Sequence, residues 1–141
     1  MVLTRAQIVL QTDSEKRLTS SIGSLLQGVL MQHIDPAYGE VLHRSELKPY
    51  SQFISFGASE AIWTVQTLTE AAERQIIAPL LISDFSSVYL GHKDLELPIT
   101  LKTVTHLTEE ELMTQTFFAE CSRKIRVHFV TPCSFKSHGV Y

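Results

Sequence analysis

The segment YSQFISFGASEAIWTVQTL, residues 50–68, carries the strongest local signal for structure in this chain. The runs 50–56 and 61–68 are rich in aromatic and β-branched residues, which favour strands, and the residues GASE between them are typical of a turn. The segment therefore predicts a β-hairpin. Phe53 and Trp63 lie in its two strands, and we expect both rings in the hydrophobic core.

Two helices are predicted before the hairpin. The first follows from apolar residues at helical spacing, which form one stripe: Ile22, Leu25, Leu26, Val29, Leu30 and Ile34. Asp35 and Pro36 then favour a second helix, with Asp35 as the N-cap and Pro36 at the first helical position. Because Pro49 disfavours helical backbone just before it, this helix should end around His43 to Arg44.

A third helix is predicted after the hairpin. Thr67 and Glu70 have the spacing of a capping box, so the run TEAAERQIIA should be helical. Pro79 is expected to end this helix, since proline disrupts the interior of a helix.

The remaining segments are mostly strand-like. Residues 86–90 and 95–106 are predicted strands, and Thr108 with Glu111 predicts a short helix after them. The run KIRVHFV, residues 124–130, alternates apolar and basic residues and predicts a last strand whose apolar side joins the core.

These elements, with a first strand over residues 5–11, give the order β-α-β-β-α-β followed by extra strands. That order is typical of the ferredoxin-like fold. We therefore predict an α+β domain: an antiparallel sheet, helices on one face and extra C-terminal strands. The 141 residues suit a single domain. Because the chain stops directly after a predicted strand, we expect it to be the N-terminal domain of a longer two-domain protein.

The composition is globular, with 44% hydrophobic and 19% charged residues. A net charge of −3 argues against a generally basic nucleic-acid-binding surface, although a local basic patch remains compatible with it. Cys121 and Cys133 are too few for a disulfide framework and are not spaced as zinc ligands. Without a signal peptide or a membrane-spanning run, we expect a cytoplasmic protein. The scattered histidines predict no metal site, and we expect no cofactor.

His43 and Lys48 lie at the joint between the second helix and the hairpin. Histidine acts as an acid or a base near neutral pH, and lysine can hold a phosphate. Since Lys48 precedes Pro49, we expect extended backbone that directs Lys48 away from the helix. From spacing alone, a solvated polar connection without function is the simpler interpretation.

The last predicted strand offers a second basic group. Its polar face could contact phosphates, with two further basic residues nearby: Lys124, Arg126 and His128 on the strand, and Arg123 and Lys136 beside it. An ordinary solvated face of an antiparallel sheet is the alternative.

Two stretches resemble a known family. LLQGVLMQHIDPAYGEVLHRSELKPYSQFISF has the order of a first helix, a second helix ending in LH, and then KP with an aromatic residue opening a strand. VHFVTPCSFKSHGVY has a strand, TP, an aromatic residue and G-x-Y. This order is similar to that of the RAMP-type CRISPR-associated endoribonucleases that process repeat RNA, the sixth Cas family. The resemblance spans the chain but only about the first half of a typical member.

The resemblance implies two ferredoxin-like domains in tandem and a specific antiviral-defence activity. Members cut precursor CRISPR RNA once per repeat without metal, leaving a 2′,3′-cyclic phosphate and a 5′-hydroxyl. His43 matches the family's general acid/base and Lys48 its phosphate-stabilising lysine. Arg44 and the basic group around residues 123–136 become expected RNA contacts, and other Cas proteins or a second copy become expected partners.

Two departures from the family leave alternatives open. Several members carry a catalytic tyrosine on the first helix, where this chain has Met31 or a neighbour, and Tyr38 lies on the next helix. Either His33 takes that role, or two groups suffice, or catalysis is impaired. The family's glycine-rich RNA-gripping loop belongs to a second domain, so this part alone should bind weakly and cut poorly. A non-cutting RNA-binding or Cas-complex module and a ferredoxin-like dimer unrelated to RNA are the alternatives.

Overall fold

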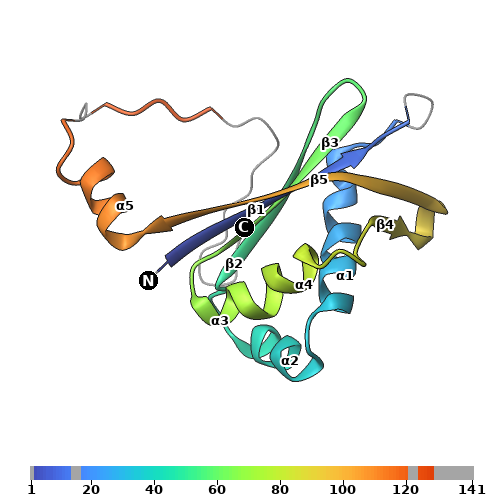
Figure 1. The fold of residues 1–141 in the computed structure, drawn as a ribbon, viewed down its shortest axis with the longest axis horizontal. Coiled ribbons are helices and arrows are strands. Elements are labelled where there is room, and N and C mark those ends of the chain that lie inside the picture. Colours follow the sequence, from blue (N-terminus) through green and yellow to red (C-terminus); the bar gives the residue numbers. More distant parts are fainter. Residues whose placement is uncertain (1, 14–16, 121–123, 129–141) are drawn as a thin grey trace, which may run out of the picture.

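The strands form one antiparallel sheet in the order β2-β3-β1-β5-β4 (Figure 1). The computed structural model describes residues 2–13, 17–120 and 124–128. The strand bounds are β1 Val2–Gln11, β2 Tyr50–Phe56, β3 Glu60–Thr67, β4 Ser87–Leu90 and β5 Leu95–Thr108.

The helical segments connect these strands. Between β1 and β2 lie the 3₁₀ turn η1 Ser20–Ile22, α1 Gly23–His33 and α2 Pro36–Arg44; between β3 and β4 lie α3 Glu70–Ala72, the π-helical turn η2 Glu73–Ile77 and α4 Ala78–Leu81. The 3₁₀ turn η3 Gly91–Lys93 joins β4 to β5, and α5 Glu109–Thr116 follows β5. Figure 1 shows α5 at the far end of β5, apart from the other helices.

The sheet confirms the predicted α+β class and is consistent with a ferredoxin-like fold. β3 pairs with both β1 and β2, and β1 pairs with both β3 and β5, all antiparallel. The predicted strand order needs one correction. Two strands follow α4, and the second of them, β5, pairs with β1, while β4 lies at the outer edge. The additional strand, β4, therefore comes before β5, the strand that pairs with β1 in the central part of the sheet.

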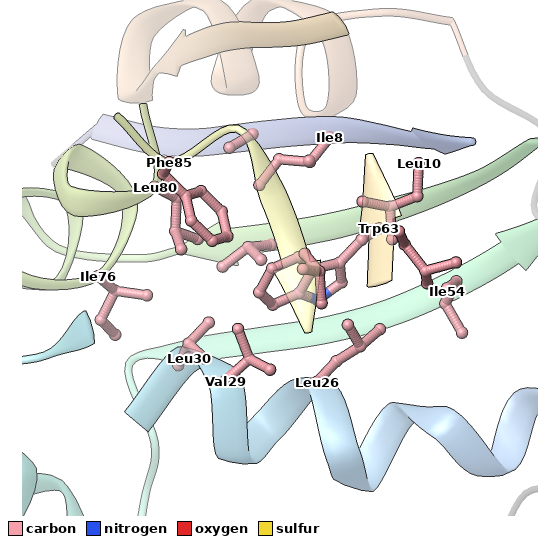
Figure 2. Close-up of a cluster of buried hydrophobic side chains, with 14 of the residues drawn as sticks. Ile8, Leu10, Leu26, Val29, Leu30, Ile54, Trp63, Ile76, Leu80 and Phe85 are labelled. Carbon is pink, nitrogen blue, oxygen red and sulfur yellow. The ribbon is translucent and has the colours of Figure 1, made fainter. Parts of the chain in front are cut away.

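The core lies between one face of the sheet and the helices. Ala6, Ile8 and Leu10 alternate along β1 and are fully buried on that face. Figure 2 shows Leu26 and Leu30 of α1 pointing into the same cluster. The predicted apolar stripe of the first helix is thus confirmed as a core-facing stripe.

Trp63 lies at the centre of this core and is fully buried. Its Nε1–H donates to Oε1 of Gln52 at 2.7 Å, and Nε2 of Gln52 donates to the carbonyl of Gly23 at 2.8 Å. The hairpin is thereby tied to the start of α1. The expectation for Trp63 is confirmed, but that for Phe53 is wrong. Phe53 is 52% exposed, because it lies on the opposite face of β2 from Gln52 and Ile54.

The predicted third helix over residues 69–78 is confirmed, but its predicted cap and its predicted end are wrong. Thr67 is the buried last residue of β3, and the N-cap is Thr69, whose Oγ1 accepts from the backbone N–H of Ala72 at 3.1 Å. Pro79 does not end the helix, which continues to Leu81. The wider π-helical turn before it accommodates the proline, since Pro79 has no N–H to give to a regular ladder.

Of the two elements predicted after β5, the short helix is confirmed and the last strand is wrong over the described residues. Thr108 and Glu111 form the predicted capping box, with Thr108 Oγ1 accepting from the Glu111 N–H at 3.1 Å. The predicted last strand is wrong over residues 124–128, which are not part of a strand. Ile125 and Val127 are 85% and 62% exposed, so they do not join the core. The rest of that predicted strand lies outside the described residues.

Candidate active site

His43 is presented to solvent by the last turn of α2. The helix begins where predicted, because the Asp35 carboxylate accepts from the N–H groups of Ala37 at 2.8 Å and Tyr38 at 3.4 Å. Leu42 is only 3% exposed and anchors the end of the helix in the core. The next residue then lies about 100° further around the helix and faces outward. His43 is accordingly exposed, and the predicted helix end at His43 to Arg44 is confirmed.

Lys48 returns to the same end of α2. Its ammonium donates to the carbonyl oxygens of Leu42 and Ser45, the latter at 2.6 Å, and approaches that of His43 at 3.4 Å. The expectation that Pro49 would direct Lys48 away from the helix is therefore wrong. The backbone leaves the helix, but the long side chain folds back onto it. The contact between the two residues that the sequence singled out is thus from the Lys48 ammonium to the main-chain carbonyl of His43.

The electrostatics of this end of α2 favour that arrangement. The C-terminus of a helix carries a partial negative charge on its unpaired carbonyls, and a lysine cation is favourable there. His43 and Lys48 together therefore place a titratable ring and a positive charge at one exposed helix end. This pair can serve proton transfer beside an anion.

A cavity of about 510 Å³ lies beside Lys48 at one end of the sheet. Its lining includes Tyr50 of β2, Gln66 of β3 and Arg5 of β1. With the Gln66 amide oriented to accept, Arg5 donates to it from Nε at 3.0 Å and Nη2 at 3.1 Å. The cavity thus offers hydrogen-bonding groups next to the His43–Lys48 end of α2.

Tyr50 is a residue that the sequence analysis did not single out. Its phenol oxygen accepts from Nε2 of Gln27 on α1 at 2.5 Å, and its ring is partly buried against the core. The sequence feature that could have pointed to Tyr50 is its position, two residues after Lys48 at the start of the hairpin. β2 therefore places a phenol next to the first helix and beside the cavity that Lys48 lines.

The side chains considered in place of a helix tyrosine have packing contacts. Met31 and Tyr38 are partly buried against the core, and burial raises the pKa of the Tyr38 phenol. His33 donates from Nδ1 to the Val29 carbonyl at 2.8 Å, and its ring meets Phe85 edge-on at a centroid distance of 4.6 Å. These contacts are those of residues that hold α1 and α2 in place.

The predicted RNA-contacting residues fall into separate regions. Arg44 is exposed next to His43, with Nε 3.7 Å from a Glu40 carboxylate oxygen. Lys124, Arg126 and His128 are exposed on a segment beyond α5, away from α2 (Figure 1). Arg123 and Lys136 lie outside the described residues. Of the predicted basic residues, the structure brings Arg44 to the candidate site and leaves the 124–128 group apart from it.

A pair formed by a histidine and a glutamate joins β5 to η2. His106 Nε2 is 2.8 Å from the Glu73 carboxylate, and this hydrogen bond lowers the pKa of Glu73. This pair could not be predicted from the sequence, because the two residues are 33 positions apart. Within the described ranges, no group of three or more histidine, cysteine or acidic residues could hold a metal. Nor is any helix there long and apolar enough to cross a membrane.

Comparison with known proteins finds similarity over nearly the whole chain. The chain is 29% identical, over 99% of its length, to a CRISPR-associated endoribonuclease Cas6 found in two strains of Mycobacterium tuberculosis. It is 27% identical, over 81% of its length, to a CRISPR-associated endoribonuclease Cas6 of Streptococcus thermophilus. The chain spans 45–46% of the length of these relatives, their N-terminal half. No protein-family model matches the chain. The resemblance noted in the sequence is thus confirmed.

Proposed function

We propose that this chain is the N-terminal domain of a two-domain endoribonuclease that processes CRISPR repeat RNA. The observation that carries the proposal is the contact of the Lys48 ammonium with the main chain of His43 and Ser45 at the exposed end of α2. The similarity to Cas6 endoribonucleases over 99% of the chain supports the substrate class. The acidic net charge of −3 favours local contacts with RNA over a general basic surface.

The proposed reaction needs two proton transfers and charge stabilisation. A base removes the proton of a ribose 2′-hydroxyl, and the oxygen attacks the adjacent phosphorus. The bond from phosphorus to the 5′-oxygen breaks as that oxygen receives a proton, leaving a 2′,3′-cyclic phosphate and a 5′-hydroxyl. His43 carries one of these transfers, as acid or base. Lys48 stabilises the negative charge on the phosphate oxygens.

A non-cutting RNA-binding module is the second candidate function. The observation in its favour is the engagement of the Lys48 ammonium by main-chain carbonyls, which leaves less of its hydrogen-bonding capacity for a phosphate. In this case the full-length protein would hold repeat RNA, alone or with other Cas proteins, without cleaving it.

The test compares full-length wild-type protein with His43→Ala on repeat RNA from the source genome, in EDTA. His92→Ala, an exposed histidine on η3, is the matched control. We expect a single cut per repeat, a cyclic phosphate on the product, and a loss of at least about 100-fold in cleavage rate for His43→Ala with RNA affinity little changed. Equal loss of binding and cleavage would remove His43 from the acid/base role. RNA that is bound but left intact by the wild type would select the non-cutting module.

A further inference from the structure

The end of α2 has carbonyl groups that the helix itself does not pair. The last carbonyls of any helix lack an N–H partner four residues on. In α2 the Ser45 N–H reaches the Val41 carbonyl at 3.1 Å, which leaves the Leu42 and His43 carbonyls to be satisfied from elsewhere. Lys48 supplies that partner, since its ammonium donates to Leu42 and approaches His43. It also donates to the Ser45 carbonyl, just beyond the helix.

The three acceptors are not held equally. An ammonium group has three N–H donors. The contacts with Leu42 and Ser45 are short, whereas the distance from Nζ to the His43 carbonyl is 3.4 Å, near the limit of a hydrogen bond. Two donors therefore hold the backbone on both sides of His43, and the third is weakly engaged.

We propose that Lys48 is a clamp that fixes the last turn of α2, and so positions His43, while its weakly held third N–H turns to the substrate phosphate. This inference rests on the proposed function and deepens it. The lysine would join the backbone that carries the acid/base group to the phosphate on which that group acts. Lys48 is then a positioning residue in the RNA-free protein as well as a phosphate ligand during the reaction.

The clamp requires the shape of an ammonium group and not only a positive charge. Three carbonyls converge on one small nitrogen centre here. The planar guanidinium of arginine spreads its donors in a fixed fork, so it cannot reproduce that convergence. Lys48→Arg therefore keeps the charge for a phosphate and loses the clamp, whereas Lys48→Met loses both.

The first experiment measures backbone amide hydrogen exchange in the full-length protein without RNA. Wild type, Lys48→Arg and Lys48→Met are compared, with Lys93→Met on η3 as the control for losing an exposed lysine. We expect exchange at the Ser45 amide and its neighbours in the last turn of α2 to be about tenfold faster in both Lys48 variants and unchanged in the control. Wild-type exchange rates in the Lys48 variants would overturn the clamp.

The second experiment measures RNA affinity and single-turnover cleavage for the same proteins. The clamp predicts that Lys48→Arg binds repeat RNA within about twofold of wild type but cuts it at least about tenfold more slowly. Cleavage by Lys48→Arg at the wild-type rate would overturn the positioning role. If wild-type protein binds RNA without cutting it, the proposed nuclease function fails, yet the exchange rates still decide whether Lys48 holds the end of α2.

Discussion

The amide side chain of Gln52 connects the hairpin to the start of the first helix. Gln52 uses its oxygen for the indole N–H of Trp63 and its nitrogen for the Gly23 carbonyl. Both partners depend on it, because a buried polar group without a hydrogen bond is costly. The position of α1 against the hairpin is thus set by polar geometry as well as by packing.

Replacing Gln52 with leucine should therefore destabilise the protein. We expect a loss of about 1–3 kcal/mol in the free energy of unfolding, because the indole N–H and the Gly23 carbonyl lose their partner. Urea denaturation measures this. Gln32→Leu, an exposed glutamine on α1, should change stability by less than about 0.5 kcal/mol. Similar values for the two variants would show that the Gln52 hydrogen bonds do not matter.

Glu73 gives the fold a pH dependence. The hydrogen bond from His106 is the main cause of its lowered pKa, relative to the ordinary value of 4.5. A carboxyl with a lowered folded pKa stabilises the fold above its unfolded pKa, and that contribution is lost as the pH falls through the folded pKa. We therefore expect stability to fall below about pH 4.5 less steeply in Glu73→Gln than in wild type. Denaturation curves between about pH 3 and pH 6 test this, and parallel profiles would contradict it.

Among the elements, α2 shows how caps at both ends of a helix can orient a candidate site residue. Its first turn is fixed by the Asp35 carboxylate and its last turn by Lys48. Between the two caps, the buried side chain of Leu42 sets which face of α2 packs against the core. The orientation of His43 thus depends on three contacts spread over the nine-residue helix.

Removing the N-cap should weaken α2 and slow cleavage without removing any group from the site. We expect Asp35→Ala to lower the free energy of unfolding by about 1 kcal/mol, since two backbone N–H groups lose their acceptor. RNA affinity should stay near the wild-type value in a binding assay, while the cleavage rate falls. Asp84→Ala, an exposed aspartate in the loop before β4, is the control and should show neither change.

The elements that the sequence predicted well are those with local signals. The hairpin, the Asp35–Pro36 start of α2 and the Thr108–Glu111 capping box depend on neighbouring residues, and each is confirmed. Thr67 and Thr69 both have a hydroxyl suited to a helix cap, and what distinguishes them is that Thr67 is buried in β3 while Thr69 accepts from the backbone of the helix. The π-helical turn that admits Pro79 leaves no sequence signature.

The site was predictable in part for the same reason. His43 comes directly after the buried Leu42, near the end of α2. Pro49 predicts that helix end, because proline disfavours helical backbone just before it. The return of Lys48 to that helix could not be read from the sequence, since the bias before proline acts on the backbone and says nothing of a long side chain. Tyr50 and the pairing of Glu73 with His106 depend on contacts between distant segments.

For the molecule as a whole, the sheet has one core-forming face. β5 illustrates this, since Leu97 is 1% exposed and Leu101, on the same strand, is 55% exposed. The pairing of β5 with β1 shifts register between Val9 and Leu10 of β1. Leu97 lies before this shift on β5, and Leu101 lies after it. The helices bury one surface of the sheet, and the candidate site at the end of α2 lies beside the strand ends that line the cavity.

The two leucines of β5 provide a matched pair of variants. Leu97→Ala should cost about 2–5 kcal/mol, because it leaves a cavity in the core. Leu101→Ala should cost less than about 1 kcal/mol, because its side chain already meets solvent. Chemical denaturation of both variants measures the difference. Equal losses would show that the second face of the sheet is also packed.

The burial of Trp63 makes it a natural optical probe. It is the one tryptophan in the chain, and its indole is shielded from solvent and hydrogen-bonded. Its fluorescence should be emitted at short wavelength in the folded state and shift to the red on unfolding. Because the ring is fully buried, RNA arriving at the end of α2 cannot touch it. Emission from this domain therefore reports the state of the core separately from ligand binding.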